Sequence, residues 1–240
     1  YQAMLEAKVY PLLRDLKQRC EHEHLLIPKA VYGYFPCQAQ GNDLVVYHPP
    51  HHVLSSDVLK MPASEFKEWV RFSFPRQNFG KNLCISDFFH SAESGLIDVL
   101  PIQVVTMGKQ ASAYAQLLFA EHRYSDYLYF HGLAVESAEA LAEVLHKSIR
   151  AELGFAQYDA TDKRKFFQQG YRGTRFSFGY PACPNLEDQQ QLFELLRPED
   201  IDMELTEEFQ LLPEQSTSAV IVVHPEAKYF NITRKGAANA

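Results

Sequence analysis

Apolar residues repeat at helical spacing in three separate blocks of the chain. Over residues 1–26 they recur three and four positions apart, and Pro11 allows a kink or a fresh start within this block. The longest block begins at Ser125, a residue type that caps helix N-termini, and ends at Gly154, a residue type common just past a helix end. A third block covers residues 186–196. These patterns predict three helices.

The remaining apolar stretches are rich in β-branched and aromatic residues. Residues 30–37 and Asp43–Tyr47 flank a turn at Gly41-Asn42 and predict a β-hairpin. Because the strands come in pairs joined by short loops and the helices stand in separate blocks, the pattern favours an α+β fold with an antiparallel sheet. Further strands are expected over 82–86, 97–106, 216–223 and 229–233, a short helix over 64–74, and a loop over 48–62.

The overall composition is that of an ordinary folded domain. The chain has 240 residues, of which 46% are hydrophobic and 22% charged, and this length can bury a core without disulfides or metals. The formal net charge of −7 disfavours nucleic acid and anionic membranes as partners. No apolar run approaches the roughly 20 residues of a membrane helix. We therefore expect the chain to bind neither nucleic acid nor a membrane. Because the chain begins with Tyr1 rather than Met, we interpret it as a segment of a longer protein.

The sequence lacks the common motifs of catalytic and metal sites. Its four cysteines are scattered without a CxxC pair, which indicates reduced thiols in a cytoplasmic protein, and Cys183 is expected to be a structural thiol. The ten histidines include no HExxH helix, so we predict no metal site. The absence of GxGxxG, P-loop and GxSxG motifs argues against dinucleotide, nucleotide and hydrolase sites. We therefore predict no catalytic residue in this chain.

Residues 172–184, RGTRFSFGYPACP, form the most unusual segment of the sequence. Two glycines and two prolines exclude a regular helix. Arg175 offers bidentate geometry for a carboxylate, and Phe178 and Tyr180 could wall an apolar slot. The alternative is a proline-rich corner with Arg175 in a surface salt bridge. On residue chemistry alone this alternative is favoured, because pockets are few per protein.

Asp87 is the second candidate binding residue. It follows the segment LCIS and precedes an aromatic pair, where a carboxylate commonly caps a turn. It could instead accept hydrogen bonds from a ligand ammonium group. With Arg175 holding a carboxylate, the two side chains would form a clamp for an amino-acid moiety.

Residues 171–184 resemble the S-adenosylmethionine-binding loop of the reactivation domain of cobalamin-dependent methionine synthase. The family pattern, Arg-x-x-x-Gly-Tyr followed by Pro-Ala-Cys-Pro, is matched in full by Arg175, Gly179, Tyr180 and residues 181–184. Further segments resemble the family in the same order: VYGYFPC with DLVVY, NLCISDFF, AEALAEVLH, and the strand 216–223 with HPEAKYF. The resemblance extends from about residue 10 to residue 230.

The resemblance implies a C-shaped single α+β domain, with a twisted antiparallel sheet flanked by helices. The domain would cover residues 1–234, and residues 235–240 would be a disordered tail. It implies S-adenosylmethionine binding in a shallow groove, with Asp87 on the ligand's amino group and Arg175 on its carboxylate. The adenosine would be held by the strand at Ile221 and Val222 and by backbone around the loop residues Gly179, Tyr180 and Ala182.

The resemblance also implies a function. The family domain supports reductive methylation of inactive cob(II)alamin to methylcobalamin, within a cytoplasmic enzyme that methylates homocysteine from 5-methyltetrahydrofolate. The folate, homocysteine and cobalamin sites lie outside this domain, and cobalamin is bound by a partner domain of the same enzyme. The electron donor is flavodoxin or a diflavin reductase. Because the sulfonium methyl is already activated, no general base or metal site is needed, which agrees with the missing motifs.

Some positions depart from the family pattern. Gln169 stands where the family often has an acidic residue, and Ile221 and Val222 are aliphatic rather than aromatic. Three residues of the long helix face a possible domain interface in the family or form a solvated face: Glu139, Glu143 and His146. Two other hypotheses stay open. The chain could be an S-adenosylmethionine-binding or interaction module without methyl transfer, or an α+β domain without a ligand.

Overall fold

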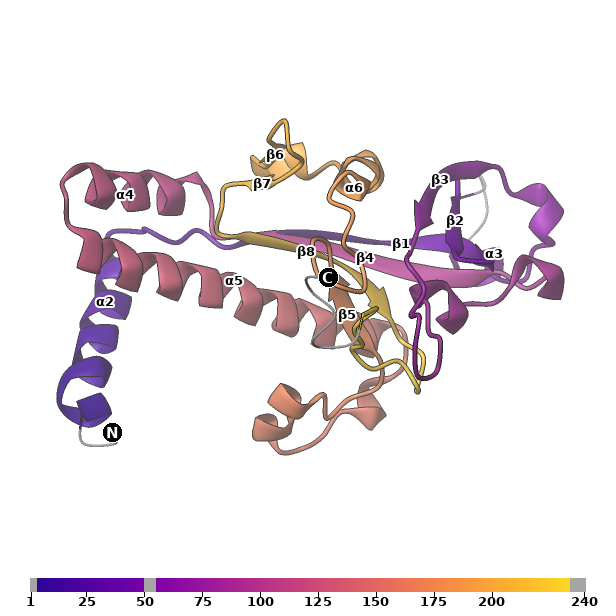
Figure 1. The fold of residues 1–240 in the computed structure, drawn as a ribbon, viewed down its shortest axis with the longest axis horizontal. Helices are drawn as coiled ribbons and strands as arrows, with labels where there is room; N and C mark the ends of the chain where they lie inside the picture. The colour runs from indigo at the N-terminus through magenta and orange to yellow at the C-terminus, as the bar shows by residue number, and fades with distance from the viewer. Residues whose placement is uncertain (1–3, 50–54, 234–240) are drawn as a thin grey trace. The chain divides into compact units, whose positions relative to one another are not determined.

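The computed structural model describes residues 4–49 and 55–233 of the chain (Figure 1). Five α-helices are assigned in this part: α2 (Tyr10–His22), α3 (Ser55–Val58), α4 (Lys109–Ala120), α5 (Tyr124–Glu152) and α6 (Asp188–Leu196). The strands are β1 (Lys29–Gln40), β2 (Asp43–Tyr47), β3 (Glu68–Ser73), β4 (Asp98–Thr106), β5 (Thr174–Ser177), β6 (Glu204–Leu205), β7 (Leu211–Leu212) and β8 (Ser216–Val222).

Six of these strands form one sheet in the order β3-β2-β1-β4-β8-β5, and β6 and β7 form a separate antiparallel pair. The predicted hairpin is confirmed: β1 pairs antiparallel with β2 around Gly41, whose φ is +61°. β2 then pairs antiparallel with β3, and β5 pairs antiparallel with β8. The prediction of an α+β fold with an antiparallel sheet is therefore confirmed.

The chain divides into two compact units. The first unit comprises Tyr1–Val31, Val104–Glu143 and Pro198–Thr217, and the second comprises Tyr32–Gln103, Val144–Arg197 and Ser218–Ala240. Several elements, among them β1, β4, β8 and α5, continue from one unit into the other.

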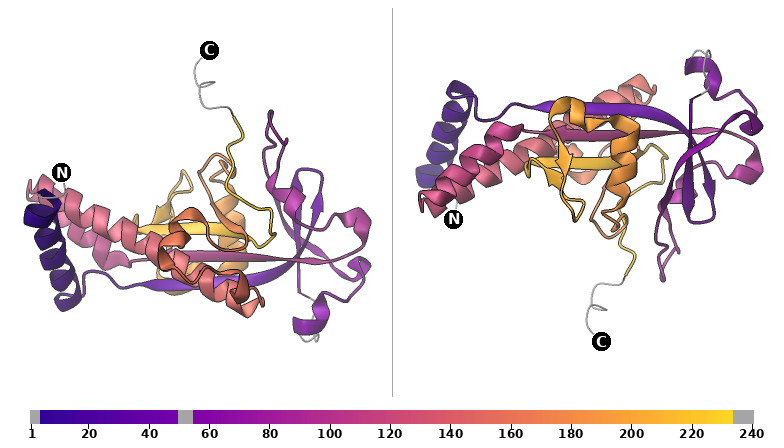
Figure 2. Two further views of the ribbon diagram at one scale, coloured as in Figure 1. Left: turned by 90° about the horizontal axis from the view of Figure 1, so that it is seen from below. Right: turned by 90° about the horizontal axis from the view of Figure 1, so that it is seen from above.

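Helices dominate the first unit. Figures 1 and 2 show α4 and the N-terminal part of α5 side by side as a helical hairpin, with α2 crossing near its turn. Small buried side chains, Ala111 and Ala115, face the interior from α4. The rings of Tyr114 and Phe130 of α5 meet edge-on with their centres 4.8 Å apart, and the guanidinium of Arg19 in α2 lies over the Tyr114 ring, 5.1 Å from its centre. These aromatic contacts join the three helices.

The second unit holds the β2–β3 hairpin, α6, β5 and the end of β8. The side chains of Leu44, Val45 and Val46 are fully buried, so this strand is covered on both faces. Helix α6 is tied to the sheet by two side-chain hydrogen bonds. Trp69 of β3 donates to Glu194 at 2.5 Å, and Ser218 of β8 donates to Gln189 at 2.8 Å.

Several elements differ from the sequence-based predictions. The helix expected over 64–74 is wrong, because Glu68–Ser73 form β3, whose alternate side chains Val70 and Phe72 are buried. The strand expected over 82–86 is also wrong, because a loop there leads into a 3₁₀ helix at Ile85–Phe88.

The long helix is confirmed, with α5 beginning at Tyr124 and Gly154 at a φ of +82° beyond its end. Helix α4 was not predicted. The expected strand over 229–233 does not form, and the expected tail over 235–240 lies outside the described residues.

Candidate functional site

The segment 172–184 contains a short strand that the glycine and proline content did not predict. β5 pairs antiparallel with β8, with Arg175 opposite Ile221 and Thr174 opposite Val222. The side chains of Thr174 and Phe176 are buried, whereas that of Arg175 is half-buried. Since β5 stands at the end of the strand order, one side of its backbone is unpaired within this sheet.

Gly173 sets the entry into β5. Its φ of +84° lies in the left-handed region, and a Cβ built there would lie 2.1 Å from the carbonyl oxygen of Val222. No side chain can occupy that space, so glycine is required for β5 to approach β8.

The loop after β5 is closed by two backbone hydrogen bonds. The Gly179 amide donates to the Cys183 carbonyl at 2.8 Å, and the Cys183 amide donates to the Tyr180 carbonyl at 2.8 Å. Gly179 adopts a φ of +85°, which a residue with a Cβ rarely adopts. Ala182 is buried, whereas the Tyr180 side chain is 56% exposed. Burial raises the pKa of the buried Cys183 thiol, which agrees with the structural role predicted for it.

Asp87 belongs to the 3₁₀ helix Ile85–Phe88, and its carboxylate caps the N-terminal end of that helix. Its Oδ2 accepts from the Cys84 amide at 2.8 Å. Arg76 donates to both carboxylate oxygens, from Nη1 to Oδ2 and from Nη2 to Oδ1, each at 2.7 Å. Burial raises the pKa of Asp87, but the hydrogen bonds from Arg76 and the Cys84 amide outweigh it, so the pKa lies below its ordinary value.

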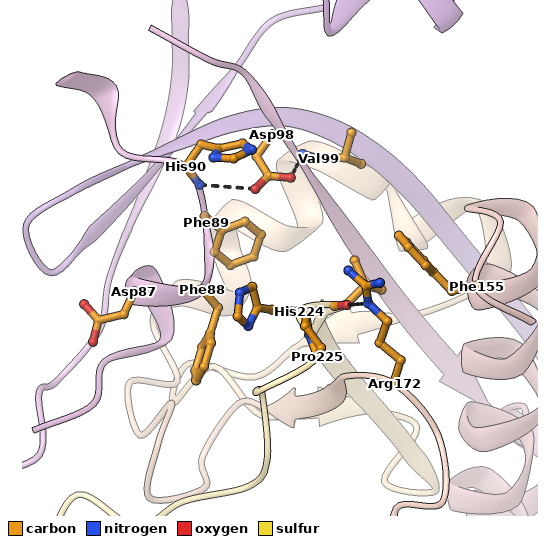
Figure 3. A pocket seen from close by; sticks show the side chains of 11 residues that line it. Asp87, Phe88, Phe89, His90, Asp98, Val99, Phe155, Arg172, His224 and Pro225 are labelled. Carbon is orange, nitrogen blue, oxygen red and sulfur yellow. Dashed lines mark hydrogen bonds between the residues drawn. The ribbon is translucent and has the colours of Figure 1, made fainter. Parts of the chain in front are cut away.

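A cavity of about 540 Å³ opens beside Asp87 (Figure 3). Figure 3 shows Asp87 at the edge of the group, with its carboxylate turned away from Phe88 and from Arg172. The two charged groups therefore do not face each other across the cavity. The lining consists of Asp87, Phe88, Phe89, His90, Asp98, Val99, Phe155, Arg172, Val223, His224 and Pro225.

Arg172 is a lining residue that the sequence reasoning did not select, although it opens the segment 172–184. Its Nε donates to the Val223 carbonyl at 2.7 Å, and its guanidinium lies 4.2 Å from the centre of the Phe155 ring. A second ring, Tyr158, lies 5.3 Å from the guanidinium. These contacts hold a cation in the cavity wall. The available signal was that the segment contains an arginine besides Arg175.

The predicted site residues fall into two groups. Arg175, Gly179, Tyr180, Ala182, Ile221 and Val222 lie on β5, its loop and β8, and Asp87 lies in the wall of the cavity. Aromatic rings lie between the two groups. The ring centres of Phe88 and Phe230 are 6.4 Å apart, and those of Phe230 and Phe176 of β5 are 5.5 Å apart. The side chains of Ile221 and Val222 are fully buried on an inner strand. Just beyond β8, residues 223–225 line the cavity instead.

His146, left open between an interface and a solvated face, is buried within the second unit. Its ring meets Tyr171 edge-on at 5.1 Å, and no exposed surface remains. Burial lowers its pKa well below the ordinary value, and the positive charges of Arg150 and Arg175 lower it further. The solvated-face interpretation is therefore wrong for His146, which is a neutral interior residue. Glu139 and Glu143 are half-buried.

The described residues, 4–49 and 55–233, show neither a metal-binding cluster nor a membrane-spanning helix. They contain no cluster of three or more histidine, cysteine, aspartate or glutamate residues able to hold a metal ion. In the same ranges no helix has the length and apolar character needed to cross a membrane. The four cysteines are all free thiols in buried positions.

Comparison with known proteins yields consistent matches. The family model described as vitamin B12 dependent methionine synthase, activation domain, matches residues 5–239. Methionine synthase of Mycobacterium tuberculosis (strain ATCC 25618 / H37Rv) is 46% identical over 243 residues, and that of Mycobacterium leprae (strain TN) is 42% identical over 243 residues. Each alignment covers 97% of this chain but 19% of the relative, so the chain spans about a fifth of their length.

A solved structure also matches the fold. The crystal structure of the MetH reactivation domain bound to AdoHcy is similar with a TM-score of 0.82 and 28% sequence identity. The match covers 97% of this chain and 72% of that one.

Proposed function

The chain belongs to the family of vitamin B12-dependent methionine synthase activation domains, and from this membership we propose that it binds S-adenosylmethionine. We further propose that it supports reductive methylation of inactive cob(II)alamin to methylcobalamin. The reaction would take place within a longer methionine synthase that methylates homocysteine from 5-methyltetrahydrofolate.

The observation that carries this proposal is the similarity to a reactivation domain bound to AdoHcy, which extends over 97% of the chain. AdoHcy is the demethylated product of S-adenosylmethionine and shares its adenosine, amino and carboxylate groups. A domain that recognises those three groups needs no catalytic side chain of its own, because the methyl group is already activated on the sulfonium. Its task is to position the ligand.

Asp87 is the proposed partner of the ligand's amino group. A carboxylate offers about four lone-pair sites, of which three are used by Arg76 and the Cys84 amide. The remaining site is on Oδ1, and the side chain is 36% exposed. An ammonium group can therefore donate to Oδ1 without displacing Arg76.

Arg175 is the proposed partner of the ligand's carboxylate, through the bidentate geometry of its guanidinium. The adenosine is proposed to lie against the loop residues Gly179, Tyr180 and Ala182 and against the strand at Ile221 and Val222. The tight loop and the unpaired edge of β5 supply N–H and C=O groups for this contact. Because the side chains of Ile221 and Val222 are fully buried, we propose that they contribute to the site only by packing beneath it.

The proposed partners follow from the same membership. Cobalamin would be bound by a partner domain of the same enzyme, and flavodoxin or a diflavin reductase would supply the electron. The proposed compartment is the cytoplasm, and the proposed domain covers residues 1–234.

Calorimetric titration of the chain with S-adenosylmethionine and with AdoHcy tests the binding proposal. Saturable binding of both with 1:1 stoichiometry is expected, and no heat at millimolar ligand would leave only the ligand-free alternative.

The second step adds a cob(II)alamin-loaded partner domain, an electron donor and methyl-labelled S-adenosylmethionine. Label on cobalamin is expected. Binding without label transfer would instead identify a module that no longer supports methyl transfer.

A further inference from the structure

The Asp87 carboxylate is held by a guanidinium rather than left to rotate freely. Arg76 donates a hydrogen bond to each carboxylate oxygen at 2.7 Å, and the Cys84 amide donates a third at 2.8 Å. This geometry fixes both the rotamer of Asp87 and the direction of its remaining lone pair.

Arg76 is in turn fixed by two other segments. Its Nε donates to Oδ1 of Asn42, in the turn of the β1–β2 hairpin, at 2.8 Å. Its Nη1 also donates to the carbonyl of Asn82 at 2.8 Å. Asn82 has a φ of +55°, so the chain there is bent to bring that carbonyl to the guanidinium. Four hydrogen bonds thus hold one arginine, and three segments depend on it.

We propose that Arg76 is a positioning residue for the S-adenosylmethionine site, which holds the Asp87 carboxylate ionised and oriented toward the ligand's ammonium group. This inference rests on the function proposed above. It assigns no contact between Arg76 and the ligand, since the guanidinium acts through Asp87.

The charges around Asp87 give the proposal a measurable consequence. The charged or titratable groups that act on the Asp87–Arg76 pair are the two partners themselves and the Cys84 thiol. Burial raises the pKa of Asp87 and is opposed by Arg76 and the Cys84 amide. Without the guanidinium, neither its hydrogen bonds nor its charge lowers the pKa of Asp87, so the pKa rises and a larger fraction of the carboxylate is protonated at mildly acidic pH. A neutral carboxyl group holds an ammonium weakly.

The test is calorimetric titration of the chain with AdoHcy from pH 5 to pH 8, comparing the wild type with Arg76→Gln. Glutamine keeps a hydrogen-bond donor and removes the cation. We expect the variant to bind about threefold more weakly than the wild type at pH 8 and about tenfold or more weakly at pH 5, because ligand affinity falls in proportion to the ionised fraction of Asp87. In the Asp87→Asn background, the same substitution should no longer change the pH profile.

Arg71→Gln is the matched control. Arg71 also makes a bidentate pair, with Glu68 at 2.9 and 2.8 Å, and its side chain is 33% exposed against 28% for Arg76. It lies on β3, outside the proposed site, and its loss should leave AdoHcy affinity unchanged at every pH. Circular dichroism melts of each variant establish that it is folded.

Three results would overturn the inference. The Arg76→Gln variant could bind AdoHcy as the wild type does, it could bind more weakly by a factor that is constant from pH 5 to pH 8, or Arg71→Gln could reproduce its profile. If Arg76→Gln does not fold, Arg76→Lys replaces it. Lysine keeps the positive charge but loses the bidentate geometry of the guanidinium. We therefore expect a wild-type pH profile with AdoHcy affinity reduced about threefold. Unchanged affinity would count against the proposal. Absence of AdoHcy binding by the wild type would remove the proposed function together with this inference.

Discussion

Two arginine–aspartate pairs in the second unit are both bidentate but differ in how far they are buried. Arg150 donates to both oxygens of Asp159 at 2.7 and 2.8 Å, with side chains 0% and 9% exposed. Arg76 donates to both oxygens of Asp87 at 2.7 Å, with side chains 28% and 36% exposed. Arg150 uses Nε and Nη2 and Arg76 uses Nη1 and Nη2, and only the second pair is accessible to solvent.

This difference separates the structural role of the Arg150–Asp159 pair from the binding role proposed for Asp87. The Arg150 guanidinium also lies 4.0 Å from the centre of the Tyr171 ring, so its charge is enclosed by protein and compensated there. Removing one partner would leave a buried charge without its counter-ion. The Asp87 side chain stands at the edge of a cavity, is 36% exposed and keeps an accepting site on Oδ1. Its loss should therefore affect ligand affinity more than folding.

The largest expected effect comes from breaking the buried pair. Asp159→Asn should lower the free energy of unfolding by about 3–5 kcal/mol, because the fully buried Arg150 guanidinium loses its bidentate carboxylate. Urea denaturation followed by circular dichroism measures this loss. The control is Asp162→Asn, whose partner Arg164 has a side chain 90% exposed. Breaking this exposed pair should lower the free energy of unfolding far less, because solvent screens the two charges. Equal losses in both variants would remove the distinction between buried and exposed pairs.

A smaller effect, on binding, is expected at the accessible pair. Asp87→Asn should weaken AdoHcy binding by about 1.5–3 kcal/mol, the contribution of a hydrogen bond to a charged group. Arg175→Ala should weaken it by a similar amount through the ligand's carboxylate. Calorimetric titration at pH 7.5 measures both. Unchanged affinity in the two variants would refute the assignment of these residues to the ligand.

The smallest effect concerns Asp188, a carboxylate whose donors are the neutral amides of Asn185 and Gln191. Burial raises its pKa to about 6, the Asn185 hydrogen bond opposes the shift, and the Glu187 charge adds to it. The folded state thus binds the proton more tightly than the unfolded chain. Its contribution to stability is present below the unfolded pKa and is lost as the pH rises through about 6.

Asp188→Asn should therefore reduce the stability difference between pH 4.5 and pH 8 by up to about 2 kcal/mol, allowing for solvent screening. Urea denaturation midpoints at the two pH values measure this difference. A pH dependence identical to that of the wild type would show that the carboxyl group is not protonated in the folded state. Asp188 then illustrates what a buried aspartate does without the guanidinium that Asp87 and Asp159 possess.

Local chemistry was sufficient to predict some features of this protein. The hairpin at Gly41, the length of α5 and the antiparallel α+β class follow from periodicity and turn residues, which act over a few neighbouring positions. The irregular loop with Gly179 was also visible, because glycine and proline restrict the backbone whatever their surroundings.

Predictions from local sequence patterns were wrong or missing where burial determines the secondary structure. Glu68–Ser73 were expected to be helical, but pairing with β2 and burial of alternate side chains make them a strand. Helix α4 was not predicted, because two of its three buried residues, Ala111 and Ala115, are alanines and give only a weak apolar pattern.

The sequence by itself determined the family motif, the fold class and the candidate binding residues, since these depend on residue identity and short-range spacing. Tertiary structure alone decided that Arg76 holds Asp87, that Arg172 rather than Arg175 lines the cavity, and that His146 is buried. Those outcomes depend on how segments distant in the chain approach one another. The charge and orientation of a side chain are then set by the partners that folding brings to it.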